Sequence, residues 1–311
     1  MKMTRFQLTG LLLIVCSNTG SMKANTLNDV LKNSTVPVAG PSGEGTAVII
    51  GKKDDYYYLL TASHVVGSAE GDQSEVLLPG NNYEAVQVIK SFPGKDLSLA
   101  KFFSKSINLN PIPINDFLPY PAPNTPESEG VVNLRSSVNT VTNKAMVAGY
   151  SLPTKAVSVR VFRVVDSEVV DRIEGNKDGY DLLYQSSTIP GMSGGAVVGF
   201  RDCTNRGEYA HGGFALGISP GNVFPTLIAI HGRSEDYQGQ GRSGISLGVP
   251  IGNDIATYLR NNATDLGILR GEAKLRDHIN KHYCIGGHSI NDMLRKMGNQ
   301  PSGSGALKFG F

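Results

Sequence analysis

The sequence has no tryptophan, only three cysteines and few charged residues: Asp, Glu, Lys and Arg make up 18% of its 311 residues, compared with roughly 25% in an average domain. Three cysteines cannot form the disulfide framework on which very small secreted domains depend. A formal net charge of +2 argues against a nucleic-acid-binding protein, which needs a strongly basic surface. The chain does contain 40% hydrophobic residues, 37 glycines and 16 prolines. This composition allows a sizeable core and predicts a turn-rich, mostly β protein.

Long hydrophobic runs are also missing, since a membrane-spanning helix needs about 20 apolar residues. The apolar stretch over residues 6–16 is roughly half that length, and it follows the basic residues Lys2 and Arg5. Small and polar residues come next, which completes the layout of a signal peptide. We therefore predict that residues 1–24 are a signal peptide and that the mature protein is secreted, periplasmic or luminal. Retention as an anchor, with Cys16 lipidated, is the alternative.

Short β runs separated by Gly, Pro, Asn and Asp make up most of the chain. We expect strands over residues 46–50, 56–60, 74–78, 84–90, 97–103, 131–134, 144–148, 156–165, 181–186, 196–200, 226–231 and 243–249. Many short strands at this spacing are typical of an all-β barrel or sandwich. A short helix is expected over residues 252–261, where apolar residues share one face.

A dense group of prolines lies between residues 109 and 126. Such a stretch cannot be a central strand and is a natural linker. We therefore expect two β domains, residues 37–126 and 127–262, the first ending in this linker. Residues 263–311 follow as a tail that is partly helical and partly disordered.

Three short motifs carry reactive side chains: His64 at the end of an apolar strand, Asp96 just before another, and Ser193 in a glycine-rich turn. A serine hydroxyl is a poor nucleophile until a base removes its proton. A neutral imidazole can do so when a carboxylate fixes its tautomer. Glycine leaves the backbone open, so the N–H groups of Gly191 and Ser193 are candidates for binding an oxyanion.

Each motif alone has an ordinary structural explanation. His64 could be a packed or capping residue, Asp96 a turn residue, and the glycines only a flexible turn. Asp72 and Asp116 are rival carboxylates, but neither precedes the same Asp-Leu-x-Leu pattern. The joint occurrence of the three motifs in order favours a catalytic triad.

The motifs Thr61-Ala-Ser-His64, Asp96-Leu-Ser-Leu and Gly191-Met-Ser193-Gly-Gly resemble those of chymotrypsin-like (trypsin-fold) serine peptidases, in that family's chain order. The version is similar to secreted bacterial and cyanobacterial trypsin-like peptidases, and more distantly to glutamyl endopeptidases. The resemblance covers about residues 37–260. It implies two six-stranded antiparallel β-barrels, with His64 and Asp96 on the first and Ser193 on the second. It also implies an acyl-enzyme mechanism that needs no metal or organic cofactor.

Two departures from the family pattern bear on activation and specificity. Met192 stands where many members have an aspartate that pairs with a newly cut N-terminus, so we expect no such activation step. Ser187 stands where trypsin-like members place an aspartate for Lys or Arg substrates. His231 resembles the histidine with which glutamyl endopeptidases bind an acidic side chain, and Thr188 could add a hydroxyl. We therefore expect a preference for Glu or Asp, although His231 could simply hydrogen-bond backbone at a strand end.

The sequence as a whole predicts a secreted serine endopeptidase acting on proteins or peptides, with no nucleic-acid partner and no span in the mature form. The alternative is a catalytically silent, protease-like binding module that acts through its C-terminal tail. Removal of the signal would leave Cys203 and Cys284, which could pair in an oxidising compartment. The sequence indicates no oligomeric state.

Overall fold

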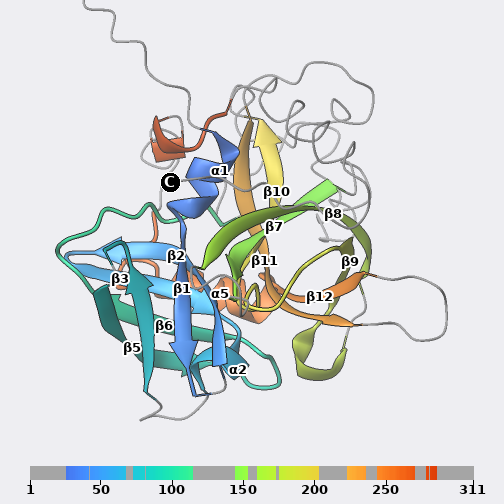
Figure 1. The fold of residues 1–311 in the computed structure, drawn as a ribbon, viewed down its shortest axis with the longest axis horizontal. Coiled ribbons are helices and arrows are strands. Elements are labelled where there is room, and N and C mark those ends of the chain that lie inside the picture. Colours follow the sequence, from blue (N-terminus) through green and yellow to red (C-terminus); the bar gives the residue numbers. More distant parts are fainter. Residues whose placement is uncertain are drawn as a thin grey trace, which may run out of the picture.

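Two closed barrels, each of six antiparallel strands, make up the body of the protein in this computed structural model (Figure 1). The all-β, two-barrel expectation is therefore confirmed. The structure describes residues 26–41, 43–67, 73–80, 82–114, 144–152, 160–172, 175–202, 223–235, 244–269, 278–279 and 281–285. The predictions that fall outside these residues include the signal peptide, Asp72, Asp116, the strand over residues 131–134, Cys203, and the tail over residues 270–277 and 286–311.

The first barrel contains β1 (Thr35–Gly40), β2 (Gly43–Lys53), β3 (Tyr56–Thr61), β4 (Ser74–Leu78), β5 (Asn82–Ser91) and β6 (Ser98–Phe103). The strands are hydrogen-bonded in the order β1-β2-β3-β6-β5-β4, and β4 pairs with β1 to close the barrel. β2 and β3, at two of the expected strands, form an antiparallel hairpin with Asp54 in the left-handed region at φ 56°. Aspartate is among the few residues that adopt this conformation readily. The sequence pattern did not indicate β1.

The second barrel contains β7 (Lys144–Ser151), β8 (Val161–Arg172), β9 (Leu182–Ser186), β10 (Ala196–Asp202), β11 (Val223–Glu235) and β12 (Ile245–Pro250). Their order is β10-β11-β12-β9-β8-β7, closed by pairing of β10 with β7. The expected strand over residues 156–165 is displaced, because β8 runs on to Arg172 through polar residues such as Glu168 on its exposed face. One solvated face is normal for an antiparallel sheet. The run over residues 131–134 lies outside the described residues.

The helices α1 (Leu27–Lys32) and α5 (Asn253–Asn261) precede the first strand and follow the last one, respectively. α5 follows β12, as expected. α1 was not expected; a capping box between Thr26 and Asp29 begins it, and this arrangement satisfies backbone donors at a helix start. No helix in the described part of the chain is long and apolar enough to cross a bilayer.

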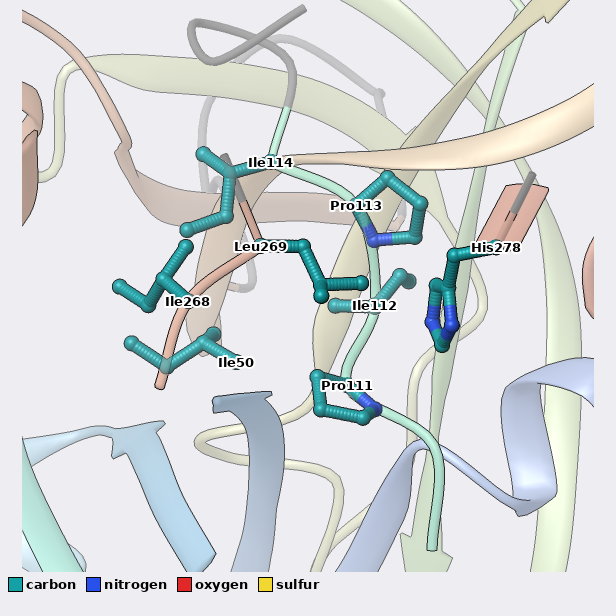
Figure 2. Close-up of a pocket in the computed structure, with 8 residues that line it drawn as sticks. All are labelled: Ile50, Pro111, Ile112, Pro113, Ile114, Ile268, Leu269 and His278. Atoms are coloured by element: carbon teal, nitrogen blue, oxygen red, sulfur yellow. The ribbon is translucent and has the colours of Figure 1, made fainter. Parts of the chain in front are cut away.

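Part of the expected tail packs into the shared hydrophobic core. Among the described residues beyond 262, the buried apolar side chains of this core are those of Ala263, Leu266, Ile268, Ile279, Tyr283 and Ile285. The Tyr283 hydroxyl donates to the carbonyl of Pro111, in the chain leaving the first barrel, at 2.6 Å. Figure 2 shows this region, where an apolar pocket is lined by Ile50, Pro111, Ile112, Pro113, Ile114, Ile268, Leu269 and His278. Residues 263–269 and 278–285, where described, therefore belong to the folded body.

Candidate active site

Strand pairing brings His64 and Asp96 to the same end of the first barrel. β3 pairs antiparallel with β6, which puts Thr61 opposite Ser98. His64 follows β3 in the one-turn helix α2 (Ser63–Val66), and Asp96 stands just before β6. The backbone N–H of His64 donates to Asp96 Oδ1 at 2.8 Å, and the ring Nδ1 lies 2.6 Å from Oδ2. The histidine and the carboxylate singled out in the sequence are thus hydrogen-bonded to each other.

The Asp96 carboxylate is stabilised in its charged form. Burial raises the pKa of this carboxyl, but hydrogen bonds from His64 and Tyr180 and attraction to the His64 ring outweigh burial and place the pKa below its ordinary value. An ionised carboxylate only accepts hydrogen bonds, so Nδ1 of His64 carries the proton. The Nε2 atom of a neutral ring is then free to act as a base. The side chain of His64 is 46% exposed and that of Asp96 only 10%, so the base faces outward while its partner is enclosed.

The glycine-rich turn around Ser193 links β9 to β10 and depends on glycine for its shape. Gly191 and Gly194 have φ angles of +94° and +82°, in the left-handed region, which glycine adopts at no steric cost. A Cβ on Gly194 would lie 2.0 Å from the carbonyl oxygen of Thr46 and 3.1 Å from the amide nitrogen of Ala62. The turn is therefore pressed against the first barrel, beside the segment that leads into His64.

Thr46 on β2 hydrogen-bonds this turn to the first barrel. Its backbone N–H donates to the carbonyl of Ser193 at 2.8 Å, and its hydroxyl donates to the carbonyl of Gly191 at 3.0 Å. The same hydroxyl accepts from the backbone N–H of Tyr150 on β7 at 2.8 Å. Thr46 is fully buried. One side chain from the first barrel therefore fixes two segments of the second.

The turn leaves its key polar groups available. Among the described hydrogen bonds, none uses the Ser193 hydroxyl or the backbone N–H groups of Gly191 and Ser193. No hydrogen bond joins Ser193 to His64 in the described structure. Catalytic hydrogen bonds are often long or misaligned until substrate binds. The arrangement offers a serine, a base and two unoccupied N–H donors on adjoining segments.

A cluster of hydroxyl groups lies at the end of β9 and on the neighbouring strands. Thr188 Oγ1 contacts the hydroxyl of Ser234 on β11 and lies 2.9 Å from that of Ser246 on β12. Ser187, by contrast, is exposed and takes no part in the described hydrogen bonds of this cluster. The cluster is therefore polar, hydrogen-bonding and without a carboxylate of its own.

His231 on β11 is buried, with 2% of its surface exposed. Its Nδ1 contacts the hydroxyl of Tyr184 on β9, and its backbone N–H donates to the carbonyl of Gly195 at 2.8 Å. Burial, with a smaller contribution from His64, lowers the pKa of His231 to about 3. The ring is therefore neutral near pH 7. His231 lies within β11 rather than at a strand end; its backbone N–H bonds to Gly195, and its ring has a different partner, Tyr184.

A comparison with family models matches the trypsin-like peptidase domain over residues 45–202, a span that contains His64, Asp96 and Ser193. The chain belongs to the trypsin-like peptidase family. No curated protein matches it. Among solved structures, this trypsin-like peptidase is similar to the Rv3671c protease of M. tuberculosis H37Rv in an inactive form, with 14% identity over 75% of this chain and 92% of that chain and a TM-score of 0.44. The HtrA-type protease AlgW with a decapeptide shows 19% identity over 76% of this chain and 65% of that chain, at a TM-score of 0.43. At these identities and TM-scores neither likeness bears on activity.

In this trypsin-like peptidase the residue before Ser193 has a packing role. Met192 is fully buried in an apolar cluster of the second barrel with Val147 and Val197. An apolar side chain in that position offers no charge with which an N-terminal amine could pair. The expectation that no such activation step exists remains a prediction.

Three residues of the site were not found from the sequence. Tyr180 donates to Asp96, Thr46 holds the serine turn, and Ser234 joins the hydroxyl cluster. Their partners lie 84, 145 and 46 residues away, respectively. Of the three, only Thr46 lies beside a distinctive residue, since it directly follows Gly45 near the start of a strand. A single glycine before a threonine does not indicate a role in a site.

Cys284 is disulfide-bonded. Its expected partner, Cys203, lies outside the described residues. A disulfide at this position fixes the C-terminal segment, whose neighbouring Tyr283 is already buried in the core.

Proposed function

We propose that the protein is a secreted serine endopeptidase in which Ser193 is the nucleophile, His64 the base and then the acid, and Asp96 the carboxylate that orients the histidine. The observation that carries this proposal is the double hydrogen bond between Asp96 and His64. A base held in this way and a serine turn with unoccupied N–H groups together supply the base, the nucleophile and the oxyanion donors that acyl transfer needs.

The chemistry follows from the positions of the atoms. His64 Nε2 takes the proton of the Ser193 hydroxyl as its oxygen attacks the carbonyl carbon of the scissile peptide. The N–H groups of Gly191 and Ser193 bind the oxyanion, and Asp96 stabilises the imidazolium without taking its proton. His64 then gives the proton to the leaving amine, which leaves an acyl-enzyme. A water molecule, deprotonated by His64, hydrolyses the ester and restores the serine.

Covalent labelling tests the nucleophile directly. A fluorophosphonate should modify one serine per chain, and peptide mapping should find the adduct on Ser193, because a serine reacts quickly only where a base can take its proton beside an oxyanion site. Heat-unfolded protein is the control and should remain unlabelled. Failure of the native protein both to label and to digest casein would contradict the proposal and favour the silent binding module.

We also propose that the substrate side chain before the scissile bond is acidic. The hydroxyls of Thr188, Ser234 and Ser246 lie together and offer several donors to a carboxylate. Charge-assisted hydrogen bonds of this kind are the strong ones. A basic side chain would meet no carboxylate in this cluster, since Ser187 replaces the one that Lys and Arg require.

Peptides that differ only in Glu or Gln before the scissile bond test this specificity. Glu should be favoured in kcat/KM by at least about tenfold, because Gln has the same shape but no charge to bind. Ser234→Ala should reduce that ratio, whereas the exposed Ser106→Ala on the first barrel should not change it. Equal rates for Glu, Gln, Ala and Arg peptides would exclude the acidic preference.

Export across a membrane belongs to the same proposal. The signal-like segment at residues 1–24 supports it, and so does the disulfide at Cys284, because disulfides persist mainly in oxidising compartments.

A further inference from the structure

Tyr180 extends from the second barrel to the Asp96 carboxylate of the first. Its hydroxyl donates to Asp96 Oδ2 at 2.5 Å. This is the oxygen that faces Nδ1 of His64, while Oδ1 accepts the backbone N–H of the same histidine. The carboxylate is therefore held by three donors, and one of them comes from the opposite barrel.

The loop that carries Tyr180 also binds the main chain of Asp96. The backbone N–H of Asp96 donates to the carbonyl of Asp178 at 2.7 Å. Asp178 adopts the left-handed region at φ 60°, and the Asn176 side chain donates to the carbonyl of Tyr180 at 2.9 Å. Both the backbone and the side chain of Asp96 are thus fixed by one short, internally braced loop.

The ring of Tyr180 occupies space that a glycine leaves open. A Cβ on Gly232 would lie 2.0 Å from the Cε1 atom of this ring, so no other residue fits there without displacing the tyrosine. The Arg233 guanidinium lies 4.9 Å from the ring centroid, and Tyr180 is 3% exposed. The hydroxyl is therefore aimed at Asp96 by packing against β11, the strand that also carries His231.

We propose that Tyr180 is a positioning residue for the catalytic pair: its hydroxyl keeps Asp96 aligned with His64 and shares the negative charge of the carboxylate. The inference rests on the proposed function, because it assigns Tyr180 a role within that site. A carboxylate that shares its charge with a second donor attracts the proton of the imidazolium less strongly. Loss of the hydroxyl should therefore change both the orientation of the ring and the pH at which it takes up a proton.

The charged and titratable groups around this pair come from several elements. The charges of Arg233 and Asp178 influence the pKa of Tyr180. Lys95 lies beside Gly179 and pairs with Asp254 at 3.9 Å. His64 is close enough to His231 to influence its pKa. Burial and the hydrogen bond to Asp96 raise the pKa of Tyr180, so it remains a donor at working pH. Tyr180→Phe leaves every one of these neighbours in place and removes only the hydroxyl.

The test compares Tyr180→Phe with Tyr283→Phe, which removes another buried hydroxyl that donates to a backbone carbonyl away from the site. Tyr180→Phe should lower kcat by about tenfold to hundredfold with little change in KM, because a hydrogen bond to a charged group is lost at the catalytic pair. The acid limb of the kcat/KM profile should move up by about half a pH unit or more. Tyr283→Phe should lower thermal stability but leave kcat and the pH profile unchanged.

A double-mutant cycle shows whether Tyr180 acts through Asp96. In an Asp96→Asn background, Tyr180→Phe should cost less than about twofold, since residues that act as one unit are not additive. An equal loss in both backgrounds, or an unmoved pH profile, would overturn the inference. Gly232→Ala, which forces the ring away, should reproduce the kcat loss of Tyr180→Phe.

Failure of the inference can be separated from failure of the proposed function. If the wild type labels at Ser193 and cleaves peptides but Tyr180→Phe behaves like wild type, only the inference is wrong. If the wild type neither labels nor cleaves, the proposed function is wrong. NMR titration of the His64 ring then still decides the role of Tyr180, because an unchanged midpoint in Tyr180→Phe would overturn it without reference to activity.

Discussion

Ser193→Ala should abolish peptide hydrolysis, with a fall in kcat on the order of 10⁵- to 10⁶-fold, the loss typical of removing a catalytic serine. The residue left behind has no oxygen to attack the scissile carbonyl, and water cannot use the same geometry. The fold should be unaffected, because the turn is held through the backbone carbonyl of Ser193, which accepts from the N–H of Thr46. A methyl side chain leaves that bond in place. Peptide hydrolysis measures the loss of activity, fluorophosphonate labelling the loss of the nucleophile, and thermal unfolding the unchanged stability of the fold.

Ser106→Ala supplies the matched control for that experiment, since it removes an exposed hydroxyl from the first barrel. It should label and turn over like wild type. Activity of Ser193→Ala within tenfold of wild type, with unchanged stability, would show that another group is the nucleophile. The pairing of His64 with Asp96 would then need a different explanation.

Asp96→Asn should lower kcat by about 10⁴-fold while leaving the protein folded, the effect expected when the histidine is held in the wrong tautomer. The side-chain oxygen of Asn should stay on the backbone N–H of His64, which already donates to Oδ1. The amide NH₂ then takes the place of Oδ2 and faces Nδ1. An NH₂ group can only donate, so the ring proton must move to Nε2 and the base is lost. Kinetics with a fixed peptide and a melting curve measure both parts of the prediction.

Asp178→Asn is the matched control, because it removes a charge of the same sign from the loop beside Asp96. The side chain of Asp178 is exposed, and only its carbonyl bonds to Asp96. Asparagine also tolerates the left-handed conformation found there. The control should keep kcat within about twofold, as a surface charge change usually does. A similar small loss for Asp96→Asn would mean that Asp96 does not orient the base.

The motifs of the proposed triad could be found from the sequence because each lies in a distinctive local context. His64 ends an apolar strand, Asp96 begins one, and Ser193 is surrounded by glycines whose positive φ angles the turn requires. Strand spacing indicated only a barrel or a sandwich, and the two six-stranded barrels were implied by the family resemblance. Pairing of β3 with β6 then explains why two of the motifs meet.

The rest of the site depends on contacts that sequence reasoning does not see. Tyr180, Thr46 and Ser234 are ordinary residues whose importance comes from partners on distant strands. The helix α1 had a local signal, the capping box of Thr26 and Asp29, but its six residues are too few for the apolar periodicity that indicates a helix. The shift of β8 has a similar cause, because polar residues on an exposed strand face look like the end of a strand.

Thr46 links the association of the two barrels to the shape of the turn that carries Ser193. Its hydroxyl bonds to the carbonyl of Gly191 and the amide of Tyr150 at once, so separation of the two barrels at this point would break the hydrogen bonds that hold the turn before Ser193. We therefore expect a ligand or a mechanical load that separates the barrels here to lower the proposed peptidase activity before either barrel unfolds. The catalytic rate would then report on the contact between the two barrels.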